Sequence, residues 1–198
     1  MRTVLLQSLA VALIGCGTIA KAENLIFFNR CAYPVEVGKT WTEPFAVVDA
    51  GQSYVHNLGA DDVPREAIAI YAFRPGRNGG AGNATLAEFT LNHQGVDYYD
   101  VSIVDAFSVP MSIHPPGFPA CPVAACEQDL IDMCPASQRL IRDGVTIACT
   151  KFNDRDNPNN PLARLAAEQC PNAYSWSSSP GTKGCNGSRD FMVTLCKK

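Results

Sequence analysis

The chain has 198 residues, of which 46% are hydrophobic and 18% are charged, and its formal net charge is −3 at pH 7. This length suits one domain with a substantial core, and the acidic balance argues against nucleic acid as a partner. The chain also lacks the basic runs that bring proteins to anionic membranes.

Residues 1–22 are expected to be a secretory signal peptide. Arg2 supplies a positive charge, residues 4–14 are mostly apolar, and Ala20-Lys21-Ala22 offers small residues where signal peptidase reads them. Cleavage leaves a mature domain of residues 23–198, with a net charge of −5 because Arg2 and Lys21 are removed. The apolar run is short for a membrane span, so we expect a secreted, extracellular protein without a membrane anchor.

A second interpretation of this segment stays open. Leu13-Ile14-Gly15-Cys16 fits a lipobox, which would leave Cys16 acylated in a bacterial lipoprotein. Ala20-Lys21-Ala22 is an ordinary cleavage site and is the interpretation that we prefer.

The first half of the mature chain predicts many short strands. Turn residues such as Asp49-Ala50-Gly51 and Arg74-Pro75-Gly76 separate runs of alternating or continuous apolar residues. Short strands with such punctuation are typical of an all-β sandwich. The predicted strands are 24–28, 33–38, 45–48 and 67–73.

Residues 85–113 predict two further strands joined by a short turn. They contain four carboxylates, Glu88, Asp97, Asp100 and Asp105. Carboxylates on paired strands can converge on one sheet face, and two converging carboxyl groups are the minimum equipment for glycoside hydrolysis.

The later part of the chain has a different character. Residues 127–133 predict a short helix that ends at Cys134-Pro135. Residues 161–169 predict a second helix, with Asn160 as the N-cap. A polar loop at 153–160 precedes this helix, and residues 190–195 predict the last strand.

Cysteine usage indicates an oxidising compartment. Without Cys16 the mature chain has eight cysteines, an even number that predicts four disulfides behind a signal peptide. No C-x-x-C pair occurs and the histidines are remote from the cysteines in sequence, so we expect no metal site and no cofactor. Asn83 and Asn186 begin sequons and are candidate glycosylation sites. The cysteines are Cys31, Cys121, Cys126, Cys134, Cys149, Cys170, Cys185 and Cys196.

Several segments resemble the thaumatin-like family, also called the osmotin or pathogenesis-related thaumatin type. They are similar to the family's first strand, its TLAEF segment, its D-x-YD-x-S-x-VDGFN-x-PM segment, its CPA, ACTxF and CPDAYSY motifs and its terminal strand. Their order and spacing make the match specific. The matching residues are 28–35, 85–92, 97–111, 134–136, 148–152, 170–175 and 193–196.

The resemblance implies a mainly β, thaumatin-like β-sandwich with a small disulfide-rich, partly helical subdomain at about 121–185. The family's Cys-rich loop before TLAEF and its Cys-Cys pair after ACTxF are absent here, so this is a short-type member. The implied disulfides are Cys31–Cys196, Cys121–Cys185 and Cys126–Cys170, which leaves Cys134 with Cys149.

The family's acidic cleft contains one arginine, one glutamate and three aspartates. By resemblance, Glu88, Asp100 and Asp105 match three of these five residues. The third aspartate should follow Ser175 and the arginine should lie near Ala69, but neither is present. Three other arginines could substitute if the fold brings one to the cleft, namely Arg65, Arg74 and Arg77.

Strand geometry constrains the two aspartates. Asp100 and Asp105 differ by five positions, so on one regular strand they would face opposite sides of the sheet. If both line the cleft, a bulge or a strand end must lie between them. The alternatives are that one of them accepts backbone hydrogen bonds at a turn, and that Glu88 is a solvated outward residue.

We expect a monomer that binds β-1,3-glucan or a related cell-wall polysaccharide through this cleft, in a defence or antifungal role. Asp100 would contact the sugar, and Tyr99 and Phe107 would stack on it, although aromatic residues more often pack in the core. The alternative is an endo-β-1,3-glucanase with Glu88 as general acid and Asp105 as nucleophile or water-activating base. Inhibition of a foreign hydrolase or permeabilisation of a fungal membrane also stays open, and no sequence feature specifies its target.

Overall fold

A computed structural model describes residues 24–197, except for residues 41, 60–66, 77–80 and 188–189. The predicted signal peptide with Cys16 lies outside the described residues, as do Arg65 and Arg77.

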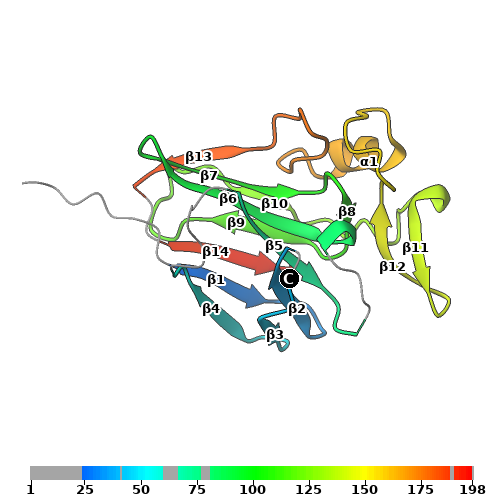
Figure 1. The fold of residues 1–198 in the computed structure, drawn as a ribbon, viewed down its shortest axis with the longest axis horizontal. Coiled ribbons are helices and arrows are strands. Elements are labelled where there is room, and N and C mark those ends of the chain that lie inside the picture. Colours follow the sequence, from blue (N-terminus) through cyan, green and yellow to red (C-terminus); the bar gives the residue numbers. More distant parts are fainter. Residues whose placement is uncertain (1–23, 41, 60–66, 77–80, 188–189, 198) are drawn as a thin grey trace, which may run out of the picture.

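Two sheets form the body of the molecule (Figure 1). The larger sheet has the order β13 (Lys183–Asn186), β7 (Val96–Ser102), β6 (Thr85–His93), β5 (Ile68–Phe73), β2 (Val35–Lys39) and β3 (Ala46–Val48), with all neighbours antiparallel. The smaller sheet has the order β10 (Ala124–Cys126), β9 (Met111–His114), β14 (Asp190–Leu195), β1 (Asn24–Asn29) and β4 (Ser53–Asn57). In it, β1 and β14 run parallel and the other pairs antiparallel. The predicted mainly β fold is confirmed.

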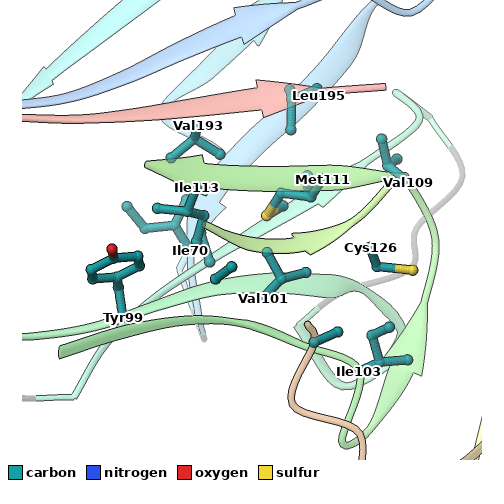
Figure 2. Packing of buried hydrophobic residues seen from close by; sticks show 14 of the residues in the cluster. Ile70, Tyr99, Val101, Ile103, Val109, Met111, Ile113, Cys126, Val193 and Leu195 are labelled. Carbon is teal, nitrogen blue, oxygen red and sulfur yellow. The ribbon is translucent and has the colours of Figure 1, made fainter. Parts of the chain in front are cut away.

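The hydrophobic core lies between the two sheets. Along β1 and β14, half-buried and buried residues alternate, so one face of each strand points inward. Figure 2 shows Val193 and Ile113 from the smaller sheet and Val101 and Ile70 from the larger sheet in this layer. Each fully buried side chain of this kind contributes about 1.5–3 kcal/mol to stability.

The strands predicted from apolar patterns are present, with ends that move by one or two residues. Residues 85–113 contain more strands than the two predicted, because the β6–β7 hairpin ends at Ser102 and two short strands, β8 (Ala106–Phe107) and β9, follow it. The confirmed predictions correspond to β1, β2, β3, β5, β6, β7 and β14.

A third, smaller sheet stands at one end of the sandwich, beside the helix α1 (Pro161–Gln169) (Figure 1). It contains β11 (Arg139–Arg142), β12 (Val145–Thr150) and β8 (Ala106–Phe107), in that order. Two short 3-10 helices complete the described elements, η2 (Ala81–Asn83) and η3 (Ala136–Gln138).

The predicted helix at 161–169 is confirmed. Asn160 Oδ1 accepts a hydrogen bond of 2.9 Å from the backbone N–H of Leu162, as expected for an N-cap. Leu162 and Ala166 are buried and Leu165 is half-buried, so the predicted apolar face packs on the protein.

The predicted helix at 127–133 is wrong. This segment forms turns without a helix, and Asp129 Oδ1 accepts a hydrogen bond of 3.0 Å from the backbone N–H of Ile131. Such a local side-chain bond offers the backbone a turn instead of a helical hydrogen bond, and Cys134-Pro135 prevents the pattern from continuing.

Four disulfides connect the layers, and their pairing agrees with the pairing that the resemblance implies. Cys31–Cys196 joins the two ends of the described chain over 165 residues. Cys121–Cys185 connects the loop before β10 to β13, and Cys126–Cys170 connects β10 to the end of α1. Cys134–Cys149 attaches the turn region before η3 to β12.

The aromatic cluster between the sheets predicts a large loss of stability on truncation. Phe191 is fully buried, with ring centroids 5.3 Å from Phe89 and 5.0 Å from Tyr99. Phe191→Ala should lower the free energy of unfolding by about 3–5 kcal/mol, because the cavity has no partner atoms to fill it. Tyr98→Ala, at an exposed position, is the control and should change it by about 0.5 kcal/mol or less. Urea unfolding measures both, and a loss below about 1 kcal/mol for Phe191→Ala contradicts the core assignment.

Candidate functional site

Glu88 and Asp100 are direct neighbours across the β6–β7 pair. Side chains at opposite positions of an antiparallel pair have Cβ atoms about 4.5–5.5 Å apart, so the two carboxyl groups share one environment. On the other side of Glu88, its partner on β5 is Ala69. The two predicted acids therefore meet on one face of the larger sheet, next to a small residue.

Asp100 is buried in this pair. Its Oδ2 accepts a hydrogen bond of 3.2 Å from the Thr182 hydroxyl, whereas Oδ1 has no hydrogen-bond partner among the described residues. Burial, and then the negative charge of Glu88, raise the pKa of Asp100 to about 7, and Thr182 and Lys183 only partly oppose this. Asp100 can therefore hold a proton near neutral pH.

Glu88 is half-buried, and its pKa is also raised. Burial is the main cause, and the negative charge of Asp105 adds to it. The Ser102 hydroxyl and the positive charge of Arg155 act in the opposite direction and lower the pKa of Glu88. A carboxyl group with a raised pKa can donate a proton to a ligand or hydrogen-bond it in either protonation state.

Asp105 lies beyond the end of β7, which finishes at Ser102. A strand end therefore lies between Asp100 and Asp105, which is one of the two arrangements expected if both were to line a cleft. Asp105 Oδ1 forms an ion pair of 2.9 Å with Arg155 Nε, and its side chain is 26% exposed. Its backbone oxygen accepts a hydrogen bond of 2.9 Å from the N–H of Lys151.

These groups border a hollow with a volume of about 540 Å³. Asp100 is not part of the lining and lies behind it, next to Glu88. The lining combines hydrogen-bond acceptors, a cation, amides and one aromatic ring, which is the mixture that polar ligands with apolar faces require. The residues that matter here are Asn83, Glu88, Asp105, Phe152, Asn153 and Arg155.

Arg155 lines the hollow and was not among the site candidates that the sequence indicated. The resemblance places the family's arginine near Ala69, and Ala69 does line the hollow, but the cation arrives from the loop between β12 and α1. Arg74, one of the substitutes considered, lies with its guanidinium 3.8 Å from the centroid of the Tyr33 ring and lines another hollow. The polar stretch 153–160 indicated only a surface loop, because a local pattern does not report where a loop docks.

Lys151 anchors this loop. Its side chain is 2% exposed, and its Nζ donates a hydrogen bond to the backbone oxygen of Ser175. Burial lowers the pKa of Lys151 to about 8, although the negative charges of Asp105 and Asp154 oppose the shift. The buried lysine thus joins the loop after β12 to the segment where the family's third aspartate was expected.

Within the described part of the chain, Glu88 and Asp105 are the carboxylates that line the hollow, so the lining contains no third aspartate. Burial, and then the negative charges of Asp100 and Glu88, raise the pKa of the nearby Tyr174. The neutral Thr182 hydroxyl donates a hydrogen bond to Asp100 and adds no negative charge that would oppose the ionisation of this carboxyl group.

The predicted sugar-stacking residues require a correction. Tyr99 is 1% exposed, its ring lies in the core against Phe191, and its hydroxyl donates to the backbone oxygen of Pro122 (Figure 2). Phe107 is fully buried. Neither ring has a face open to a sugar, because Tyr99 points from β7 into the hydrophobic core and Phe107 on β8 is part of the same core.

The two sequons differ in position. Asn83 ends η2 and lines the hollow, and the third sequon residue, Thr85, is fully buried with its hydroxyl accepting from the N–H groups of Ser108 and Val109. A glycan on Asn83 would therefore stand at the hollow. Asn186 is exposed at the end of β13. Glycosylation at both sites stays a prediction.

Within the described ranges, no group of three or more His, Cys, Asp and Glu side chains could hold a metal ion. In the same part of the chain, no helix has both the length and the apolar character that crossing a bilayer requires.

The raised pKa of Asp100 predicts how stability depends on pH. Folded Asp100 keeps a proton that the unfolded chain releases between about pH 4 and pH 7, so its contribution to stability is lost as pH rises through this window. Asp100→Asn removes the titration, and the stability of the variant relative to wild type should increase with pH, by at most about 1.4 kcal/mol per pH unit.

Urea unfolding at pH 4, 5.5 and 7 measures this difference. Asp132→Asn, at an exposed position, is the control and should show a constant difference from wild type. An equally constant difference for Asp100→Asn contradicts the assignment of the buried proton.

Comparisons with known proteins agree with this architecture. The model of the thaumatin family matches residues 74–197. The pathogenesis-related 5 protein Jun a 3.0101 of Juniperus ashei is 30% identical over 199 residues, and the pathogenesis-related thaumatin-like protein 3.8 of Cryptomeria japonica is 34% identical over 199 residues. In both cases the match covers 85% of this chain and 85% of the relative.

A solved structure, the protein elicitor MoHrip2 from Magnaporthe oryzae, is similar with a TM-score of 0.49 and 14% identity, over 89% of this chain and 100% of that chain. This similarity is too weak to support an argument. The family model, in contrast, includes the carboxylate-bearing hairpin, β12 and the cysteine-rich segment, and the chain belongs to the thaumatin family.

Proposed function

We propose that this protein is a secreted defence protein that binds β-1,3-glucan or a related cell-wall polysaccharide in the hollow beside Glu88. The observation that carries the proposal is the convergence of Glu88, Asp105 and Arg155 on that one hollow. The pathogenesis-related names of the relatives support a defence role, and four disulfides suit an oxidising, extracellular compartment.

The chemistry of the lining supports a carbohydrate ligand. Each sugar hydroxyl both donates and accepts hydrogen bonds, so a site needs acceptors and donors on a rigid frame. Glu88 supplies acceptors from a central strand, Arg155 supplies donors, and Asn83 and Asn153 supply both. The volume of about 540 Å³ lies within the range of small-molecule and cofactor sites.

Retention on insoluble β-1,3-glucan tests this proposal. Glu88→Gln and Asp105→Asn keep the side-chain shape and remove the charge, and each should weaken binding about 10- to 100-fold, because hydrogen bonds to charged groups contribute about 1.5–3 kcal/mol. Glu168→Gln makes the same charge change at an exposed position of α1 and should bind as wild type does. Unchanged retention of both variants of the hollow would falsify the proposed site.

A second function, endo-β-1,3-glucan hydrolysis, is favoured by one specific observation. The raised pKa of Glu88 suits a general acid, and Asp105 is the other carboxylate that lines the hollow. The ion pair between Asp105 and Arg155 leaves Oδ2 of Asp105 outside that contact, where it could act as nucleophile or water-activating base.

Release of reducing sugar from laminarin by the pure protein decides between binding and hydrolysis. If the enzyme proposal holds, Glu88→Gln and Asp105→Asn should each reduce the rate at least about 100-fold, because each carboxyl group has its own role in the reaction. Glu168→Gln should leave the rate unchanged. Retention on glucan without any release between pH 4 and pH 7 excludes the enzyme and keeps the binding proposal.

A further inference from the structure

Phe152 is an aromatic side chain that the protein exposes at the hollow. Its side chain is 53% exposed, and it lines the hollow with Glu88, Asp105 and Arg155. Tyr98 is the other large aromatic residue with high exposure in the described part of the chain, and it does not line this hollow. Exposed apolar side chains are common one by one, so the position of this ring at a polar hollow, and not its exposure alone, makes it available to a ligand.

The backbone of Phe152 has a conformation that bulky residues rarely adopt. Its φ is 48°, and Asn153 follows with a φ of 73°, so two successive residues lie in the left-handed region. This region is uncommon for a side chain such as phenylalanine, and such a conformation persists only where the surroundings enforce it. Asparagine adopts the left-handed region readily, so the φ of Asn153 is ordinary, whereas the φ of Phe152 is unusual for its residue type.

Hydrogen bonds on both sides of Phe152 enforce this conformation. The Thr150 hydroxyl accepts a bond of 3.2 Å from the N–H of Phe152. The N–H of Lys151 donates to the backbone oxygen of Asp105 at 2.9 Å, and its buried Nζ donates to Ser175. The N–H of Asp154 donates a hydrogen bond of 3.1 Å to the backbone oxygen of Lys151. The loop therefore presents the ring in a fixed place, next to the chain segment that carries Asp105.

We propose that Phe152 is a stacking platform that selects β-linked, gluco-configured sugars in the hollow; this inference rests on the proposed function. A pyranose ring with all its substituents equatorial has axial C–H groups on both faces, and such a face packs against an aromatic ring. The hydroxyl groups at its edge are then free to reach Glu88, Asp105 and Arg155. An axial hydroxyl, as in galacto- or manno-configured sugars, places a polar group on one of these faces and weakens the stacking.

A structural role alone explains Phe152 less well. A ring that served only the core would be covered, and the left-handed φ would favour asparagine or glycine at this position. Retention of phenylalanine in this conformation lowers stability, which is a recurrent property of functional positions. The two roles therefore predict opposite effects of replacing the ring by asparagine.

The test measures both binding and stability. Soluble β-1,3-gluco-, β-1,4-gluco-, β-1,4-galacto- and β-1,4-manno-oligosaccharides of equal length are titrated calorimetrically against wild type, Phe152→Ala, Phe152→Trp and Phe152→Asn. Tyr98→Ala is the control for loss of an exposed aromatic ring. Wild type should prefer the gluco-configured sugars, Phe152→Ala should bind them about tenfold more weakly, and Phe152→Trp and Tyr98→Ala should bind about as wild type does. Phe152→Asn, which also lacks the ring, should bind the gluco-configured sugars about tenfold more weakly while its Tm is equal to or above that of wild type.

The outcomes separate this inference from the proposed function. If wild type binds β-1,3-gluco-oligosaccharides and Phe152→Ala binds them equally well, the platform is wrong and the glucan proposal stands. If wild type prefers the β-1,4-gluco series and Phe152→Ala loses that binding, the platform stands and the β-1,3 assignment is wrong. Equal affinity of wild type for galacto- and gluco-configured sugars overturns the selectivity, and absence of binding to all four series overturns both proposals.

Discussion

The pairing of β12 with the two-residue strand β8 is the constraint on which the site depends. Cys149 and Thr150 pair with Phe107 and Ala106, and the N–H of Lys151 continues this ladder by bonding the backbone oxygen of Asp105. This pairing places the loop after β12 beside the segment that follows β7. A cation and an aromatic ring from residues 152–155 therefore line the same hollow as Asp105 and Glu88, which lie between 47 and 67 positions earlier in the chain. The Cys134–Cys149 disulfide also holds β12 in place, because it links this strand to the turn region before η3.

The site also depends on how the protein limits the charge that it buries. Two carboxyl groups at opposite positions of a strand pair cannot both ionise at low cost when they are withdrawn from water. The pKa of Asp100 is raised to about 7, so this carboxyl group keeps part of its proton near neutral pH, and the neutral Thr182 hydroxyl bonds it where a further acid would add repulsion. Negative charge is instead concentrated where the hollow opens, at Asp105, which has a cation beside it. A ligand in the hollow therefore meets one ion pair and one carboxyl group of raised pKa.

Local patterns in the sequence predicted what local forces determine. Apolar or alternating residues identified β1, β2 and β5, and the N-cap Asn160 identified α1. The failures have one local cause and several long-range causes. The helix expected at 127–133 is replaced by a turn that one aspartate side chain stabilises, and the burial of Tyr99 and Phe107 depends on which sheet face meets the core. Arg155 and Phe152 escaped notice because the docking of their loop is a long-range event.

The position of the arginine changes what the hollow can accept. An arginine on β5 would stand at the central sheet, directly beside Glu88, because Ala69 is the cross-strand partner of that residue. With alanine there, the floor of the hollow is open, and the cation comes from a loop side chain that is 57% exposed. An ion pair this exposed is weak, so Arg155 can exchange its contact with Asp105 for a ligand hydroxyl at little cost. The same loop holds Phe152 rigidly through its backbone. The loop thus combines a cation that can change its contacts with an aromatic ring held in a fixed place. This combination suits a sugar, because the ring of a sugar stacks in one way while its hydroxyl groups can take different positions.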